Sequence, residues 1–262
     1  MTELACFDGH VAPAAETRIE VTDEGFLRGD GAFEVVRVYD GRPFALDEHL
    51  DRMERSAANL RLDGVPRLEL EEEAVQLLRK RGGGEFDGCL RIVLTRSGHR
   101  LLMTEPLPPA AARPRLGLVT YAPTRVLDGV KSLSYAANML CGRIARERGF
   151  DEALMVTPHG RVLEAPTASI FWVDAGGTLR TPPLDDHILA SITRDRVMTL
   201  VDVQETAVTA DEIRQAREAF LASTTREVQP VGAIEDREFP EAGEVTDKAA
   251  SALRAQIESE LS

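Results

Sequence analysis

Residues 28–57 read RGDGAFEVVRVYDGRPFALDEHLDRMERSA. From 32 to 46, apolar and β-branched residues flank an Asp-Gly pair, a pattern typical of two strands joined by a tight turn. From 46 to 62, apolar residues recur every three or four positions, which predicts an amphipathic helix. A strand pattern followed directly by a helical pattern predicts a mixed α and β fold.

The rest of the N-terminal half continues both patterns. Residues 68–81 predict a second helix, acidic at its start and basic at its end, as the helix dipole prefers. Residues 89–98 and 116–121 read as strands, because their side chains are apolar or alternate. The N-terminal half is therefore expected to be mixed α and β.

Two stretches rich in proline, glycine or alanine interrupt these patterns, at 105–114 and at 122–129. Such segments are typical of connections between compact parts of a chain. We place a domain joint at the second one. The expected organisation is an N-terminal α/β domain over 1–120, an interdomain loop over 121–129 and a C-terminal α/β domain over 130–262.

The C-terminal half alternates helical and strand patterns. Its first helix ends at Gly149, which suits a C-cap, and its last begins at Thr246-Asp247, which suits an N-cap. The predicted helices are 134–149, 192–201 and 245–261, and the predicted strands are 152–157, 169–173 and 218–224.

The charge balance argues against nucleic acid as a partner. The chain of 262 residues has 31 Lys and Arg against 44 Asp and Glu, a net charge of −13. An acidic surface repels phosphate backbones. No apolar run is long enough to span a bilayer, so no membrane partner is expected.

The cysteines and histidines indicate neither a disulfide framework nor a metal site. Cys6, Cys89 and Cys141 are far apart and odd in number, and the five histidines lack ligand spacing. The first residues show no basic region followed by an apolar run, as a signal peptide would. We expect a cytoplasmic protein without a metal ion.

Lys131 lies in GVKSLSY, between a predicted loop and a predicted helix. A lysine in such a position is more often a solvated surface residue. A buried lysine can instead form a Schiff base with an aldehyde cofactor. That chemistry also needs donors for a phosphate and a charged partner for the cofactor ring.

Five motifs in order support the second reading of Lys131, and together they cover most of the chain. They are residues 28–57, KSLSYAANML (131–140), GRVLEAPTASIFWV (160–173), TPPL with ILASITRDRV (181–197) and FLASTTREVQPV (220–231). The set resembles the class IV aminotransferases, the fold-type IV group of enzymes that use pyridoxal-5'-phosphate (PLP). This group includes branched-chain and D-amino acid aminotransferases, (R)-amine transaminases and aminodeoxychorismate lyases.

The resemblance implies two α/β domains with PLP in the cleft between them, and a homodimer whose partner loops close the active site. Lys131 would carry the cofactor and move the proton at the substrate Cα. Arg52 would bind the phosphate, Glu164 would pair with the pyridine nitrogen, and Tyr135 would lie near the cofactor.

The remaining phosphate contacts are implied at a helix start and after a late strand. The first set is Ser191, Ile192 and Thr193, and the second is Ser223 and Thr224. The chain departs from the family pattern twice. Ser191 replaces a glycine, and Ala168-Ser169 replaces the Ser-Asn pair that follows the glutamate.

Substrate contacts are less sharply indicated. The residues expected to bind substrate are Arg28, Phe33, Arg37, Arg91, Arg180 and Thr225. Further candidates for the α-carboxylate are Arg96, His99, Arg100 and Arg226. His99-Arg100 follows TRSG where D-amino acid enzymes often carry Arg-x-His, and Arg28 stands where branched-chain enzymes have a tyrosine.

Three readings of the activity stay open. The number of candidate arginines suits a small carboxylate substrate and favours a transaminase acting on an amino acid and a 2-oxo acid, with D-amino acids favoured. The alternatives are an aminodeoxychorismate lyase, which forms 4-aminobenzoate and pyruvate, and a branched-chain L-amino acid aminotransferase. A further alternative, which is not an enzyme, is a binding or structural protein that kept the fold without PLP.

Overall fold

The computed structural model describes residues 2–241 and 243–262, which divide into two compact units. The first unit contains the chain up to Pro108 together with Gly129–Tyr135. The second contains Pro109–Asp128 and Ala136–Glu260. Both units contain helices and sheets, as expected of a mixed α/β chain.

The first unit is built on a six-stranded antiparallel sheet with the order β2-β1-β6-β5-β3-β4. Its strands are β1 (Leu4–Phe7), β2 (His10–Pro13), β3 (Gly31–Tyr39), β4 (Arg42–Pro43), β5 (Gly88–Thr95) and β6 (Arg100–Glu105). Its helices are α1 (Glu24–Arg28), α2 (Leu46–Leu60) and α3 (Arg67–Arg81), and a short 3₁₀ helix covers Gly83–Glu85.

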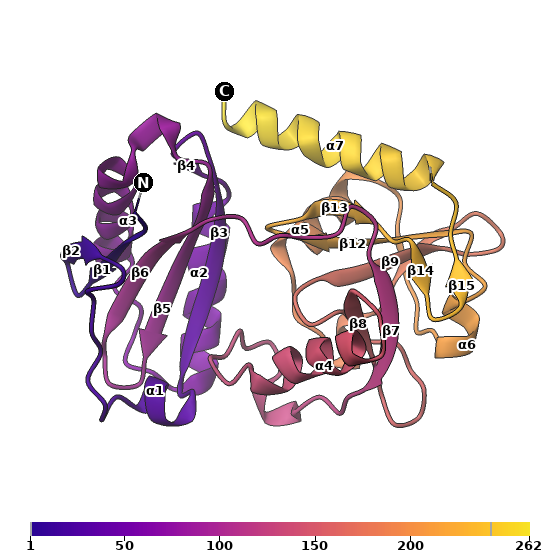
Figure 1. The fold of residues 1–262 in the computed structure, drawn as a ribbon, viewed down its shortest axis with the longest axis horizontal. Helices are drawn as coiled ribbons and strands as arrows, with labels where there is room; N and C mark the ends of the chain where they lie inside the picture. The colour runs from indigo at the N-terminus through magenta and orange to yellow at the C-terminus, as the bar shows by residue number, and fades with distance from the viewer. Residues whose placement is uncertain (1, 242) are drawn as a thin grey trace. The chain divides into compact units, whose positions relative to one another are not determined.

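Helices α2 and α3 pack on one face of this sheet (Figure 1). Val36 and Val38 on β3 point to that face, because side chains alternate along a strand. They meet Leu50 and Met53 of α2, which are fully buried. Each such side chain contributes roughly 1.5–3 kcal/mol when it leaves water.

The predicted turn between β3 and β4 is confirmed. Asp40 and Gly41 both adopt positive φ, 47° and 75°. A two-residue hairpin of this kind requires positive φ at both positions, which Asp-Gly accommodates. The predicted strand 89–98 ends at Thr95, because residues 95–99 form the turn into β6.

The segment 129–135 adds to the free edge of β3. The Phe33 amide donates to the Lys131 carbonyl at 3.0 Å, and the Leu133 amide donates to the Gly31 carbonyl at 2.9 Å. Ala32 and Ser132 form an antiparallel bridge between these two bonds. This part of the predicted C-terminal domain therefore belongs to the first unit.

The second unit holds two sheets, ordered β11-β10-β9-β12-β13 and β15-β14-β7-β8. Their strands are β7 (Arg115–Thr120), β8 (Glu152–Val156), β9 (Ser169–Val173), β10 (Leu179–Thr181), β11 (Gln204–Glu205), β12 (Glu218–Ser223), β13 (Glu227–Pro230), β14 (Ala233–Ile234) and β15 (Arg237–Glu238). The helices are α4 (Ala136–Glu147), α5 (Ile192–Leu200), α6 (Ala210–Ile213) and α7 (Glu244–Glu260), with 3₁₀ helices at Arg125–Leu127 and Leu184–Asp186.

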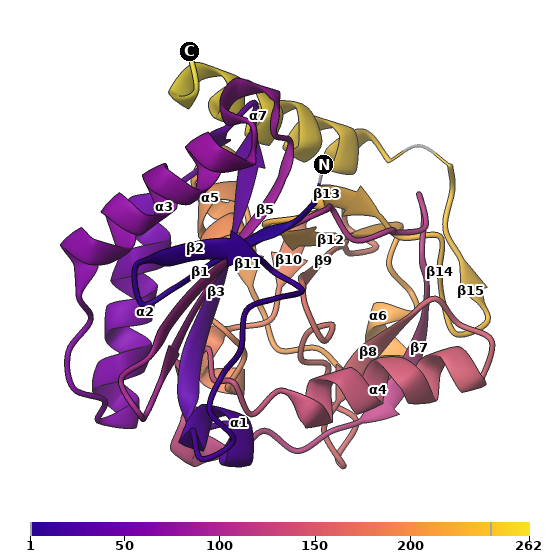
Figure 2. The same ribbon diagram turned by 60° about the vertical axis from the view of Figure 1, so that its left-hand side comes forward.

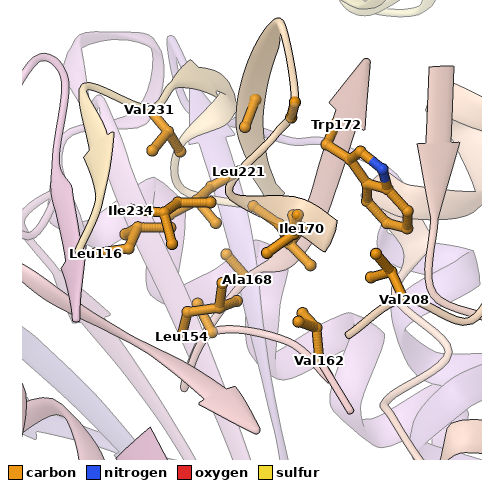
Figure 3. Packing of buried hydrophobic residues seen from close by; sticks show 14 of the residues in the cluster. Leu116, Leu154, Val162, Ala168, Ile170, Trp172, Val208, Leu221, Val231 and Ile234 are labelled. Atoms are coloured by element: carbon orange, nitrogen blue, oxygen red, sulfur yellow. The ribbon is translucent and has the colours of Figure 1, made fainter. Parts of the chain in front are cut away.

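The two sheets of the second unit share one apolar core. Leu116 and Leu154 from one sheet pack with Ile170 and Leu221 from the other, next to Trp172 (Figure 3). The opposite face of β7 and β8 is covered by α4 (Figure 2). Helices α5 and α7 pack on each other and on the strands β12 and β13.

Strand β7 explains why the division of the structure differs from the predicted domain limits. Residues 116–121 were expected to close the N-terminal domain, but β7 pairs in parallel with β8 of the second unit. A parallel neighbour is distant in sequence, so no local pattern indicates it.

The predicted helices and strands of the C-terminal half are present with ends shifted by one or two residues. The N-cap prediction at Thr246-Asp247 is wrong, because α7 already begins at Glu244. The Thr246 hydroxyl donates to Glu218 Oε2 at 2.6 Å instead. Among the described residues, no helix is both long and apolar enough to cross a membrane.

Candidate active site

Lys131 is held by its backbone between β3 and α2. Its amide donates to Ser56 Oγ at 3.1 Å, and its carbonyl accepts from Phe33 as described above. The side-chain Nζ lies 4.3 Å from the Phe33 ring centroid and 5.7 Å from the Tyr135 ring centroid. The two rings meet edge to face at 5.3 Å. The lysine amine is therefore placed against two aromatic rings, which attract a cation.

Arg52 is buried and is bound side-on by a carboxylate. Its Nε and Nη2 donate to Glu34 Oε1 and Oε2, each at 2.7 Å. Arg52 is 4% exposed and Glu34 is fully buried. Burial alone would raise the pKa of the Glu34 carboxyl, but the hydrogen bonds and charge of Arg52, with those of His49, lower it to about 2.

His49 completes this buried group. Its Nδ1 lies 2.7 Å from Glu34 Oε2. An ionised carboxylate only accepts hydrogen bonds, so Nδ1 carries the proton and donates. Burial is the largest effect on His49 and lowers its pKa. The hydrogen bond and charge of Glu34 act in the opposite direction, the charges of Arg52 and Lys131 add smaller lowering effects, and the pKa is lowered overall. His49 is therefore neutral near pH 7.

Glu34 and His49 were not among the site residues predicted from the sequence, although the sequence carried a signal for them. His49, Arg52 and Ser56 follow one another at helical spacing along α2, so they share the face that meets β3. Glu34 occupies an inward position of β3 between apolar neighbours. Polar residues at core positions of two adjacent elements were the available signal, because buried polar groups need partners.

In the second unit, Glu164 lies in an irregular segment that is hydrogen-bonded to β8. Its carbonyl accepts from the Met155 amide at 2.9 Å, and its Oε1 accepts from the Leu189 amide at 3.3 Å. The Leu189 bond orients the carboxylate in a chain that lacks the expected asparagine. Burial raises the pKa of Tyr121, and the negative charge of Glu164 raises it further.

The start of α5 supplies backbone donors for an anion. Ser191 is the N-cap, and its hydroxyl accepts from the Arg194 amide at 3.3 Å. The amides of Ile192 and Thr193 precede the first intrahelical hydrogen bond of α5, so a helix start directs them outward. The replacement of glycine by Ser191 is thus compatible with a helix terminus that binds phosphate.

Ser223, Thr224 and Thr225 lie at the connection between β12 and β13. Ser223 is 8% exposed, and its Oγ has no hydrogen-bond partner among the described residues. A buried hydroxyl without a partner is costly, so such an atom points to a missing polar group. An anionic ligand with acceptor oxygens would satisfy it.

The candidate arginines are each engaged by the protein itself. Arg28 is exposed and pairs with Glu24. Arg37 is buried, donates to Asp87 at 2.7 Å and lies 4.0 Å from the Tyr39 ring centroid. Arg180 donates to Asp174 at 2.6 Å. The further candidates pair as Arg96 with Asp30, Arg100 with Glu73, His99 with Asp8 and Arg226 with Glu152.

Arg91 is the candidate that lies near the same aromatic ring as the lysine. It donates to Glu105 at 2.7 and 2.9 Å, and its guanidinium carbon lies 5.6 Å from the Phe33 ring centroid. Phe33 and Arg91 both point to the sheet face opposite α2, as their register shows.

These donor sets fit PLP. In the first unit, Lys131 offers an amine to the cofactor aldehyde, and Arg52 offers a buried cation to the cofactor phosphate. The second unit offers a carboxylate for the ring nitrogen in Glu164, two helix-start amides and the buried hydroxyl of Ser223. No group of three or more metal-ligating side chains occurs within residues 2–241 and 243–262.

Comparison with known proteins agrees with this chemistry. The model of the amino-transferase class IV family matches residues 31–234. A D-alanine aminotransferase of Bacillus licheniformis is 31% identical, over 97% of each chain. A Methanocaldococcus jannaschii protein, named provisionally as a branched-chain-amino-acid aminotransferase, is 33% identical over 92% of each chain.

Solved structures of transaminases have a similar fold. A solved fold IV transaminase from Curtobacterium pusillum matches with a TM-score of 0.86 and 28% identity, covering 97% of this chain and 99% of the other. The chain therefore belongs to the class IV aminotransferases, which are PLP-dependent enzymes.

Proposed function

We propose that this aminotransferase moves an amino group between an amino acid, with D-amino acids favoured, and a 2-oxo acid. The observation that carries the proposal is the placement of Lys131 and Arg91 against the same ring of Phe33. Lys131, the amine that performs the chemistry, and Arg91 of β5, a cation that can bind a carboxylate, thus lie near one ring on one face of the sheet. That combination suits a small substrate whose amino group and carboxylate are attached to one carbon.

Each side chain has a role that follows from its surroundings. Lys131 holds the cofactor aldehyde and moves the proton at the substrate Cα. Arg52 binds the phosphate, together with the amides of Ile192 and Thr193 and the hydroxyls of Ser223 and Thr224. When bound, PLP supplies a ring that accepts the electrons left at Cα, and Glu164 keeps that ring protonated.

The preference for D-amino acids is supported by relatives rather than by the site. The Bacillus licheniformis protein is named a D-alanine aminotransferase and covers nearly the whole chain. The second candidate, a branched-chain L-amino acid aminotransferase, is supported by the name of the Methanocaldococcus jannaschii relative. The ring of Phe33 beside Lys131 also suits an apolar side chain.

We further propose that the enzyme is a homodimer located in the cytoplasm. The dimer is supported by exposed apolar side chains in a short segment of the first unit, at Ile19, Val21, Phe26 and Leu27. A reducing compartment is supported by three free, buried cysteines.

The test is the visible absorption of the PLP-loaded protein while single substrates are added. D-alanine, D-glutamate, L-leucine, L-glutamate and aminodeoxychorismate are each added separately. We expect D-alanine or D-glutamate to remove the band of the lysine-bound cofactor and to yield the matching 2-oxo acid. Bleaching by L-leucine or L-glutamate alone would identify the branched-chain activity. Pyruvate from aminodeoxychorismate, with no response to amino acids, would identify the lyase.

Lys131→Ala is the control for this test. We expect it to lower transamination by about 10²- to 10⁴-fold or more, because the residue that moves the proton is lost. Its thermal unfolding temperature should stay near that of the parent, because the backbone bonds at residue 131 do not use the side chain. Near-normal turnover in this variant would contradict the assignment of Lys131.

A further inference from the structure

We propose that Glu34 and His49 are positioning residues that aim the guanidinium of Arg52 at the cofactor phosphate. This inference rests on the proposed role of Arg52 in the function above. It assigns to the two buried residues the strength of phosphate binding, a property separate from the chemistry at Lys131.

The geometry of the guanidinium carries the first step. Glu34 binds the side-on edge of Arg52, formed by Nε and Nη2, with both bonds at 2.7 Å. A guanidinium is planar, so fixing this edge fixes the direction of the end-on edge formed by Nη1 and Nη2. That second edge has the spacing that binds two phosphate oxygens.

Burial and charge carry the second step. Glu34 is fully buried and accepts three hydrogen bonds, two from Arg52 and one from His49. A buried carboxylate stays ionised only with such partners, so its position is strongly constrained. Neutral His49 adds a hydrogen bond without adding a positive charge.

The third step links the arginine to the lysine. Ser56 lies one turn after Arg52 on α2, and its hydroxyl accepts a hydrogen bond from the Lys131 amide. Phe33, which precedes Glu34 on β3, donates its amide hydrogen to the Lys131 carbonyl. The same pair of elements therefore orders both the predicted phosphate ligand and the lysine. Glu34 holds the side chain of Arg52 within that frame.

A second ion pair with a buried carboxylate in the same unit serves as a control. Glu73 on α3 is 6% exposed and accepts from Arg100 on β6 through the same kind of edge, at 2.7 and 3.1 Å. It joins a helix to the sheet as Glu34 does, but neither residue contacts Lys131, Phe33 or Arg52 among the bonds described. Glu73→Gln therefore measures the cost of removing a buried carboxylate from an ion pair elsewhere in the unit.

The experiment compares the binding of PLP with that of pyridoxal, which lacks the phosphate. The full-length apoprotein is titrated with each aldehyde, and binding is followed by visible absorption. We expect Glu34→Gln to weaken PLP binding by about 10- to 100-fold, the range for hydrogen bonds to charged groups. Pyridoxal binding should change little, and Glu73→Gln should lower the unfolding temperature without changing either affinity.

Arg52→Gln and the double variant Glu34→Gln/Arg52→Gln complete a cycle. We expect the double variant to bind PLP no more weakly than Arg52→Gln, because Glu34 acts only through the arginine. His49→Gln takes the Nδ1 donor away from Glu34, because a glutamine amide occupies the place of Nε2 rather than of Nδ1. It should weaken PLP binding in the same direction, so it carries the test if Glu34→Gln does not fold.

The outcomes separate the two levels of the argument. Unchanged PLP affinity in both Glu34→Gln and His49→Gln, or an equal loss of PLP and pyridoxal binding, would overturn the positioning role. Unchanged PLP affinity in Arg52→Gln would instead overturn the proposed phosphate role of Arg52 itself.

Discussion

Burial and charge act in opposite directions on single residues of the first unit, most clearly at Glu34. Desolvation disfavours the carboxylate, but the hydrogen bonds of Arg52 and His49 hold its pKa near 2, below the ordinary 4.5. The pKa of His49 is also lowered, because burial disfavours its charged form. Both residues therefore bind fewer protons in the folded state than in the unfolded chain.

This difference predicts acid sensitivity. The contribution of Glu34 is fully present above about pH 4.5 and is lost as the pH falls towards 2, with a size of about 3 kcal/mol. Below pH 6.5 the unfolded chain also takes up a proton at His49 that the folded state excludes, which lowers stability further. Urea unfolding at several pH values measures both effects.

Glu34→Gln is the variant that isolates the first effect. Its free energy of unfolding should be lower than that of the parent at pH 7, and the gap should narrow as the pH falls below 4.5. A gap that stays constant into strong acid would contradict the assigned ionisation of Glu34. His49→Gln should flatten the part of the curve just below pH 6.5.

Strand β3 shows how one element serves two chemical purposes. Its alternation sends Glu34, Val36 and Val38 towards the helices and Phe33 towards the opposite face. One strand thus carries both the partner of Arg52 and the ring beside Lys131. Shifting its register by one residue would exchange these faces, so the turn that sets the register matters.

The turn into β4 offers a test at this scale. Gly41 has φ of 75°, and a Cβ there would lie 2.1 Å from the Gly83 carbonyl oxygen. We expect Gly41→Ala to lower the free energy of unfolding by at least about 2 kcal/mol, from a left-handed backbone and a clash with main chain.

Gly98→Ala is the matched control for the turn. Gly98 has φ of 87° but nothing within 4 Å of the added atom. It should cost only about 1 kcal/mol, the price of the backbone conformation alone. Equal losses in the two variants, measured by urea unfolding, would show that the contact with Gly83 is unimportant.

At the scale of the whole molecule, each unit is assembled from separate stretches of chain. The first unit takes 129–135 from the middle of the sequence, and the second takes β7 from before it. The lysine therefore belongs to the unit that holds Arg52, while Glu164 and the start of α5 belong to the other. The residues proposed to hold the cofactor are therefore drawn from both units.

The proposed homodimer is tested through the exposed apolar segment of the first unit. Val21, Phe26 and Leu27 are 75%, 64% and 55% exposed and lie within seven residues of the chain. Exposed apolar side chains that gather in a patch mark an interaction surface. We expect twice the chain mass of 28.7 kDa by light scattering. Phe26→Glu/Leu27→Glu should give the monomer mass.

Leu68→Glu is the control, because Leu68 is 72% exposed on α3 outside this segment. It should leave the dimer intact. A parent protein of single-chain mass, or a dimer that survives Phe26→Glu/Leu27→Glu, would contradict an interface through these residues.

Local patterns determined much of this protein. Asp40-Gly41 predicted its turn, the apolar spacing predicted α2, and the five ordered motifs predicted the family, because each pattern or motif is made of residues close together in the chain. The tertiary structure alone decided that Glu34 and His49 meet Arg52, that Lys131 joins the edge of β3, and that β7 pairs with β8. Those contacts connect residues that are far apart in sequence or on different elements, and no local periodicity records which buried polar groups become partners.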